Sequence, residues 1–387
     1  MIEGQDDGRG PDRIRLGMIG GGQGAFIGAV HRIAARIDDQ YELVAGALSS
    51  NAERALASAA ELGLAEDRSY TDVDALIAGE TGREDGIEAV AIVTPNHHHY
   101  PAAKACLEAG IHVICDKPLT VTSDQANELV ELARSKNRIL GVTYNYSGYP
   151  MIRQARAMID NGDLGDIRIV QVEYVQDWLT EPLEQTGQKQ AAWRTDPAQS
   201  GAGGAVGDIG THAYHLAGFV TGLKATSLCA DLTSFVDGRV LDDNVSVLLR
   251  YDNGAKGMLW ASQVAPGNEN GLRLRVYGTK GGLSWAQEDP NYLQFAAFGE
   301  APQRITRGGP GAGDAAAAVT RIPAGHPEGY LEGFATLYTE IAEEIRANRD
   351  GGSTGAPFPR GEDGASGVRF VEKTVESSKA GAIWVEV

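Results

Sequence analysis

The first 145 residues alternate short apolar runs with stretches of helical periodicity. The apolar runs cover residues 14–19, 41–48, 89–93, 111–115 and 139–143. The helical stretches cover residues 25–36, 52–62, 101–109 and 123–135. Strands that alternate with helices predict a parallel sheet with helices on its faces, which is an α/β fold.

After Tyr144 the pattern changes to longer, alternating strands. The sequence predicts a helix at 151–160, a long strand at 167–178, and further strands at 245–251, 257–263 and 272–277 in an antiparallel sheet across 240–285. It also predicts helices at 329–347 and 368–379, an exposed loop at 308–318 and a surface excursion at 349–366. We therefore expect two domains, residues 1–145 and 146–387, with residues 1–12 as a loose tail.

Composition narrows the expected partners. Lys and Arg number 34 against 52 Asp and Glu, which gives a formal net charge of −18. A chain this acidic lacks the basic surface that nucleic acids and anionic membranes attract, so neither is an expected partner. Its three cysteines show no zinc-motif or disulfide spacing, and no apolar run resembles a signal peptide or a membrane span. We expect a reduced, cytoplasmic protein.

A glycine-rich turn follows the first predicted strand and opens the first predicted helix. Gly20, Gly22 and Ala25 fit the pattern G-x-G-x-x-A, and Gln23, Gly24 and Phe26 complete the turn. Such a turn lets the backbone approach a pyrophosphate at a helix N-terminus. Glycine-rich turns are common, but the strand before and the helix after favour a dinucleotide site.

The tip of the second strand bears on the choice between NAD and NADP. An acid that would hold the adenine-ribose hydroxyl is expected there, but the chain has Ser49 and Ser50, with Arg54 beyond. These side chains could accept a 2′-phosphate, or they could be an ordinary helix cap. The sequence leaves both nucleotides open.

Asp208 and His212 form the most informative pair in the second half. Four residues apart on a helix, their side chains would share one face, where the carboxylate could orient the imidazole and favour its protonated form. Alone, the pair is as consistent with a helix cap and its neighbour. Together with the glycine turn and Lys117, the pair completes the groups that an alcohol dehydrogenase needs. The turn would hold the hydride acceptor, His212 would accept the proton, and Lys117 would supply the cation.

Three motifs carry a resemblance to a known family: the glycine turn, Asp116-Lys117-Pro118 in a near-match to Glu-Lys-Pro, and D-x-x-x-H at Asp208–His212. With Thr94-Pro95-Asn96-His97-His98-His99, the chain resembles the glucose–fructose oxidoreductase/inositol dehydrogenase (Gfo/Idh/MocA) family. Asp116 stands where the family usually has Glu.

The resemblance implies a Rossmann domain followed by an α/β domain with a large, mostly antiparallel sheet. It implies that Lys117 contacts cofactor ribose and substrate hydroxyl, that His212 is the general base, and that Asp208 binds substrate or orients the base. It places Thr94, Pro95, Asn96, His99 and Asp116 around NAD or NADP. It also implies a homo-oligomer, a dimer or tetramer, built on the open face of the second sheet.

The expected substrate side combines aromatic and polar residues, as a carbohydrate or cyclitol pocket does. The candidates are Tyr144, Asn145 and Tyr149 at the domain junction, Tyr174, Gln176, Asp177 and Trp178 at a strand end, and Trp193 and Arg194 before the His212 helix. Each alone is as consistent with a core aromatic or a surface ion pair. The three adjacent histidines lack the partners of a metal site, so we expect no metal.

These features predict an oxidoreductase that transfers hydride between NAD(P) and a ring secondary alcohol of a sugar, glycoside or cyclitol. Two alternatives remain: an NAD-dependent glycosidase on the same fold, and a non-catalytic protein that senses a nucleotide or sugar.

Overall fold

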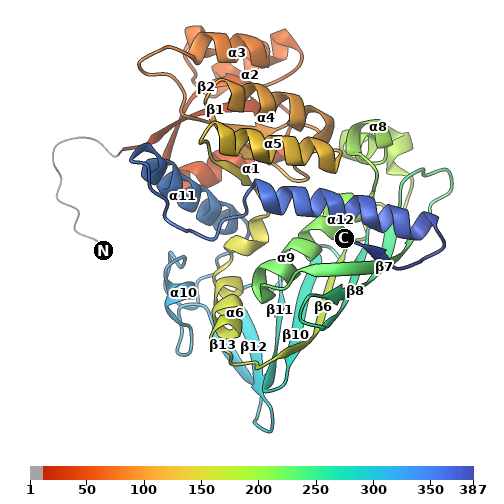
Figure 1. Ribbon diagram of the computed structural model, residues 1–387. Helices are drawn as coiled ribbons and strands as arrows, with labels where there is room; N and C mark the ends of the chain where they lie inside the picture. The colour runs from red at the N-terminus through yellow and green to blue at the C-terminus, as the bar shows by residue number, and fades with distance from the viewer. Residues whose placement is uncertain (1–11) are drawn as a thin grey trace.

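The computed structural model describes residues 12–387 and contains two sheets, one in each half of the molecule (Figure 1). The first is a five-stranded parallel sheet in the order β2-β1-β3-β4-β5. Its strands are β1 (Ile14–Gly20), β2 (Tyr41–Ala47), β3 (Ala89–Val93), β4 (His112–Cys115) and β5 (Leu140–Val142). The predicted tail lies outside the described residues except for Asp12, whose carboxylate pairs with Arg349 at 2.9 Å.

Five helices pack around this sheet. They are α1 (Phe26–Ile37), α2 (Ala52–Glu61), α3 (Val73–Glu80), α4 (His99–Glu108) and α5 (Ser123–Ser135). Asn51, Asp72 and Thr122 cap the helices α2, α3 and α5 with side-chain oxygens that accept backbone N–H bonds. Helix α1 differs, because Ala25 provides no side-chain cap and no acid lies in its first turn.

The second sheet has nine strands in the order β13-β12-β11-β10-β6-β9-β8-β7-β14. All neighbours are antiparallel except β6 and β9. The strands are β6 (Ile167–Val175), β7 (Ala225–Thr233), β8 (Asn244–Tyr251), β9 (Lys256–Ser262), β10 (Gly271–Gly278), β11 (Gly281–Ala286), β12 (Tyr292–Ala297), β13 (Gln303–Thr306) and β14 (Val385–Glu386). A parallel sheet followed by a mostly antiparallel one confirms the predicted fold class.

Helices cover one face of the second sheet and connect it to the first domain (Figure 1). They are α6 (Pro150–Asp160), α7 (Lys189–Arg194), α8 (Pro197–Ser200), α9 (Thr211–Thr221), α10 (Asp314–Ala317), α11 (Tyr330–Arg349) and α12 (Gly361–Lys379). Helix α11 returns to the first domain, where Phe334 and Leu337 share a core with Leu16 and Met18. Within residues 12–387, no helix is long and apolar enough to cross a membrane.

Three local expectations are wrong. The strand predicted at 167–178 ends at Val175, because a turn follows in which Thr180 N bonds to Asp177 O at 3.0 Å. The loop expected at 308–318 contains the short helix α10. The surface excursion expected at 349–366 is partly core: Phe358 is buried, Pro359 O accepts from Val142 N, and α12 begins at Gly361.

Gly28 sets how closely α1 approaches the glycine turn. A Cβ at this position would lie 2.3 Å from Gly21 O and 2.4 Å from Gly21 Cα.

We expect Gly28→Ala to cost about 1–3 kcal/mol of unfolding free energy, because helix and turn must separate. The matched control is Gly218→Ala in α9, where the nearest atom is 3.7 Å away. That change should be neutral or stabilise by up to about 1 kcal/mol. Urea unfolding checks both, and equal stabilities would refute the constraint.

Candidate active site

A cleft of about 580 Å³ opens where the carboxyl ends of β3 and β4 face the second sheet. Ligands of parallel α/β sheets bind at this edge, because the loops that follow the strands leave a crevice there. The cleft gathers residues that the sequence singled out in widely separated segments. They are Ala25, Phe26, Thr94, Pro95, Asn96, Asp116, Lys117, Asn145, Gln176, Trp193, Arg194, Asp208 and His212.

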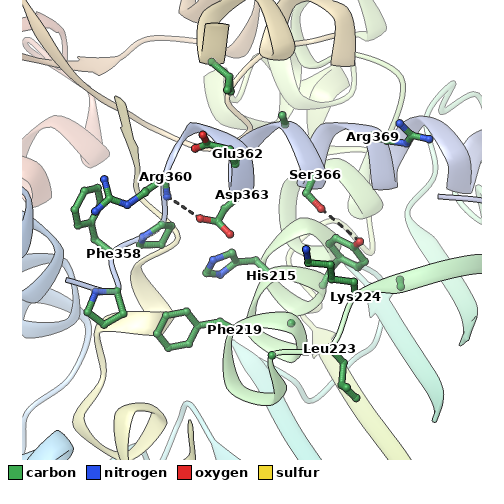
Figure 2. Close-up of a pocket in the computed structure, with 18 of the residues that line it drawn as sticks. His215, Phe219, Leu223, Lys224, Phe358, Arg360, Glu362, Asp363, Ser366 and Arg369 are labelled. Carbon is green, nitrogen blue, oxygen red and sulfur yellow. Dashed lines mark hydrogen bonds between the residues drawn. The ribbon is translucent and has the colours of Figure 1, made fainter. Parts of the chain in front are cut away.

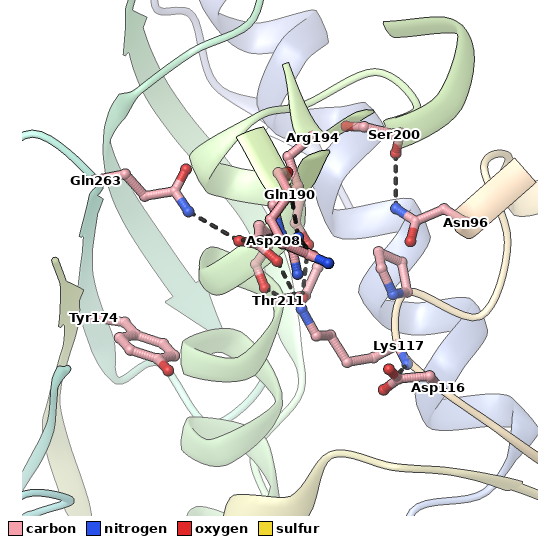
Figure 3. Close-up of polar contacts among 12 residues, drawn as sticks. Asn96, Asp116, Lys117, Tyr174, Gln190, Arg194, Ser200, Asp208, Thr211 and Gln263 are labelled. Atoms are coloured by element: carbon pink, nitrogen blue, oxygen red, sulfur yellow. Dashed lines mark hydrogen bonds and ion pairs between the residues drawn. The ribbon is translucent and has the colours of Figure 1, made fainter. Parts of the chain in front are cut away.

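The centre of the cleft is a cluster of polar contacts on Asp208 (Figure 3). Lys117 Nζ donates to the main-chain oxygen of Asp208 at 2.6 Å and to its Oδ1 at 3.0 Å. The other carboxylate oxygen accepts from Arg194 Nε at 3.2 Å and from Gln263 Nε2 at 2.9 Å. The cluster therefore ties the loop after β4 to α7 and to the end of β9.

These contacts set the charge of Asp208. Burial alone would raise the pKa of its carboxyl group, but the charges of Lys117 and Arg194 hold that pKa well below its usual range. An ammonium group has three N–H donors, and Asp208 takes two of them. Lys117 thus keeps a donor for a ligand in the cleft.

The expected pairing of Asp208 with His212 differs in the structure. Asp208 lies in a wider π-type turn, Val206–Gly210, that precedes α9, so the spacing is not that of a regular α-helix. Among the described residues Asp208 makes no hydrogen bond to His212, because its oxygens are taken by the cations and Gln263. The carboxylate does not bond the imidazole as the sequence suggested.

His212 is buried, and its pKa lies well below the usual value. Burial lowers this pKa most and the charge of Lys117 lowers it further, which together outweigh the opposing effect of Asp208. Asp208 does favour the protonated form, as expected, but burial and Lys117 outweigh its effect on the pKa of His212. A neutral imidazole can accept a proton, and because Nδ1 is buried without a partner in the described chain, Nε2 is the nitrogen left to face the cleft.

Tyrosine rings and amides form one wall of the cleft, in which Tyr174 and Gln176 were expected and Tyr146 and Asn270 were missed. Tyr146 packs its ring against His212 at 4.9 Å between centroids. Its hydroxyl bonds to that of Tyr174 at 2.6 Å, and Tyr174 donates to Asn270 Oδ1 at 2.7 Å. Gln176 donates to the same oxygen at 2.9 Å. The sequence signal that could have identified the missed residues is a polar residue at the end of an apolar strand, as occurs where β6 and β10 meet the cleft.

Several predicted residues support the cleft from outside it. His99 is buried, with ring nitrogens 2.8 Å from Thr94 O and from Pro118 O, so it braces the two loops that line the cleft. Tyr144 and Tyr149 are also buried and do not line it.

The turn after β6 does not supply the pocket walls that were expected from Asp177 and Trp178. The carboxylate of Asp177 accepts from Gly267 N at 3.0 Å, and the indole of Trp178 donates to Gln176 Oε1 at 3.0 Å. Neither side chain lines the cleft. Within residues 12–387, no three His, Cys, Asp or Glu side chains are placed to share a metal ion.

The glycine turn fits a dinucleotide. Gly20 and Gly24 have φ of +80° and +78°, conformations that favour glycine. A Cβ on Gly22 would meet Leu48 O at 2.7 Å, whereas Gly24 has no atom within 4 Å and leaves the turn open on that side. The uncapped first turn of α1 borders the cleft through Ala25 and Phe26 and leaves its N–H groups available to a phosphate.

The tip of β2 shows local capping. Asn51 Oδ1 accepts from Arg54 N at 2.8 Å, and Ser49 Oγ accepts from Asn51 N at 3.2 Å. Arg54 is exposed, and within the described chain its side chain makes no hydrogen bond. The helix-cap interpretation therefore holds for Asn51, while Ser50 and Arg54 stay available to a nucleotide.

A glycine turn that fits a dinucleotide borders a cleft with a lysine at a strand end and a neutral imidazole, a combination typical of nicotinamide-dependent oxidoreductases. Residues 14–144 match the model of an oxidoreductase family with an NAD-binding Rossmann fold, and residues 152–284 match the GFO/IDH/MocA C-terminal domain. The chain belongs to the Gfo/Idh/MocA family, and its first domain is an NAD-binding Rossmann fold.

Solved structures resemble the whole chain. An oxidoreductase from Sinorhizobium meliloti is 56% identical, with a TM-score of 0.88 over 96% of this chain and 99% of its own. An inositol dehydrogenase homologue from Azotobacter vinelandii, complexed with NAD+, is 38% identical, with a TM-score of 0.94 over 98% of each chain. It is also known in complex with NADH and myo-inositol. Levoglucosan dehydrogenase from Pseudarthrobacter phenanthrenivorans is 28% identical over 97% of this chain and 98% of its own.

Asp208→Asn tests the charge cluster. The variant leaves Lys117 and Arg194 without their partly buried counter-charge, so at pH 7 we expect a loss of about 1–3 kcal/mol of unfolding free energy. Because folding lowers the pKa of Asp208, its stabilisation is present above the unfolded pKa of about 4 and is lost as pH falls through the folded pKa. The gap between the proteins should therefore narrow in acid.

Urea unfolding between about pH 2 and pH 7 measures this gap, because the stabilisation by Asp208 falls only below the unfolded pKa of about 4. The control, Glu128→Gln, breaks an exposed ion pair with Lys104 and should change stability little. An Asp208→Asn protein as stable as this control at pH 7 would show that the cluster is not a structural requirement.

Proposed function

We propose that the protein oxidises a ring secondary alcohol of a cyclitol, sugar or glycoside, with His212 as general base. The observation that carries the proposal is a neutral, buried imidazole beside the Lys117 ammonium in a cleft at the strand ends of an NAD-binding domain. NAD, when bound, supplies the hydride acceptor. His212 Nε2 accepts the hydroxyl proton, and the remaining N–H donor of Lys117 stabilises the developing alkoxide.

The wall of the cleft supports a cyclic, hydroxylated substrate. Tyr146, Tyr174 and Trp193 offer ring surfaces, while Gln176 and Asn270 offer amide groups to hydroxyls. The homologues complexed with myo-inositol and with levoglucosan both hold a cyclic polyol. Residues that hydrogen-bond hydroxyls disfavour analogues that lack them, because their buried polar groups are then left unpaired.

His212→Ala should lower turnover by about 10²–10⁴-fold, the contribution of a general base. NAD binding should stay close to that of the wild type, because His212 lies on α9, away from the glycine turn. Steady-state kinetics and a calorimetric NAD titration measure the two effects. The control is His326→Ala, an exposed histidine outside the cleft. Near-normal turnover in His212→Ala would refute the assignment.

A substrate panel tests the substrate class. Reduction of NAD is followed with myo-inositol, levoglucosan, glucose, sorbitol and lactate. The cyclic polyols should exceed lactate in kcat/KM by at least about 100-fold. A preference for lactate or sorbitol would overturn the carbohydrate part of the proposal. Failure to accumulate NADH during turnover would instead favour the glycosidase alternative.

The same panel with NADP tests the tip of β2. If Ser49, Ser50 and Arg54 accept a 2′-phosphate, NADP should be used at least as well as NAD. Ser49→Asp should then shift preference towards NAD, because the new carboxylate repels the phosphate. Strong NAD selectivity in the wild type would show that these residues are only a helix cap.

The uncovered face of the second sheet supports our proposal that the protein is a homo-oligomer. Leu248 and Met258 face each other on β8 and β9, with exposures of 49% and 42%, and Trp260 lies beside them. Ile169 and Tyr277 extend this apolar patch across β6 and β10. An exposed apolar sheet face of this kind is typical of a surface covered by another chain.

Leu248→Lys combined with Met258→Lys should convert an oligomer into a monomer of about 41 kDa, because two neighbouring charges would have to be buried in the contact. Light scattering at micromolar concentration measures the mass. The control is Leu56→Lys on α2, a leucine of similar exposure, at 46%. A wild-type protein that is already monomeric would contradict the proposal.

A further inference from the structure

A second cavity, of about 760 Å³, lies between α9, α12 and the segment that precedes α12 (Figure 2). It shares no lining residue with the catalytic cleft. Its walls are Phe219 and Leu223 on one side and the proline-rich segment 355–359 on another. This cavity has no part in the oxidation proposed above.

His215 lies in this cavity without a protein partner. The residue is only 8% exposed, and its imidazole makes no hydrogen bond within residues 12–387. Stacking on Tyr144 at 4.3 Å and 7° fixes the plane of the ring. Burial lowers the pKa of His215 to about 4, so at neutral pH the ring presents one N–H donor and one acceptor nitrogen. Neither ring nitrogen is fully buried, so both are open to a ligand in the cavity.

Asp363 faces His215 across the cavity (Figure 2). Its Oδ2 accepts from Arg360 N at 2.7 Å at the start of α12, while Oδ1 has no hydrogen-bond donor in the described chain. The two side chains make no hydrogen bond to each other. A hydroxyl group between them can donate to Asp363 and accept from His215, or donate to His215 and accept a bond elsewhere.

Two of the four cationic residues that line the cavity have no carboxylate partner in the described chain. Arg156 pairs with Asp160 at 3.7 Å and Arg360 with Glu344 at 3.0 Å, which leaves Lys224 and Arg369. Lys224 and Arg369 are exposed and form no ion pair within the described residues. In a chain of net charge −18, this grouping creates a local attraction for anions.

We propose that this cavity binds a small polyhydroxylated anion, such as a sugar acid or a sugar phosphate. Its hydroxyls bond His215 and Asp363, its carbon skeleton packs on Phe219, and its carboxylate or phosphate pairs with Lys224 and Arg369. The proposal goes beyond the oxidation reaction and does not depend on it, because it concerns a separate cavity and is tested by binding.

Isothermal titration calorimetry on the purified full chain provides the test. Gluconate and glucose 6-phosphate are the probes, and they distinguish a carboxylate from a phosphate ligand. Glucose and inorganic phosphate are the controls, because each offers only half of the recognised chemistry. We expect at least one probe to bind at least tenfold more tightly than both controls. Equal affinities, or no binding of either probe, would overturn the proposal.

Variants locate the bound probe. Lys224→Glu combined with Arg369→Glu should weaken binding at least tenfold, and His215→Gln and Asp363→Asn should also weaken it. Lys136→Glu combined with Lys280→Glu, two exposed lysines that do not line the cavity, controls for the same change in net charge. His212→Ala should leave binding unchanged, because that residue lies in the other cleft. Binding lost in His212→Ala and retained in Lys224→Glu/Arg369→Glu would place the probe in the catalytic cleft and refute the second site.

Discussion

The carboxylate of Asp208 is the interaction on which the rest of the site depends. It meets Lys117 from the first domain and Arg194 and Gln263 from the second. Two partly buried cations would repel each other, and this carboxylate lets them share a cleft. The same contacts join the strand end of the parallel sheet to the antiparallel sheet, so they fix the position of one half of the site relative to the other.

The chemistry of His212 follows from this arrangement. Because Asp208 is engaged by the cations, it does not bond the imidazole, and burial beside Lys117 keeps the ring neutral. A neutral base next to an ammonium group suits the removal of a hydroxyl proton while negative charge develops on oxygen. In our proposal, the tyrosine and amide wall limits which hydroxylated ring can reach that nitrogen.

The sequence allowed the fold class and most of the cleft to be predicted, because both rest on local patterns. Strand–helix alternation gave the parallel sheet, and the turn at Gly20 and the Asp116-Lys117-Pro118 segment lie at the strand ends where ligands bind. The Asp208–His212 spacing misled, because a π-type turn replaced a regular helix. Gln263 and Asn270 were missed because only long-range strand pairing brings them to the cleft. The start of α12 was missed because Gly361, Gly364 and Gly367 weaken the helical pattern, although they allow close packing on Leu140, Leu119 and Tyr144.

The protonation state of His212 tests the account most directly. Nitrogen-15 NMR of histidine-labelled protein, with the His212 signals assigned by their loss in His212→Gln, reports which ring nitrogens carry protons as pH is varied. The account predicts a neutral imidazole at pH 6.5, the pH at which an ordinary histidine is half protonated. An imidazolium at that pH, or a pKa above 6.5, would show that Asp208 controls the ring after all and would contradict the account.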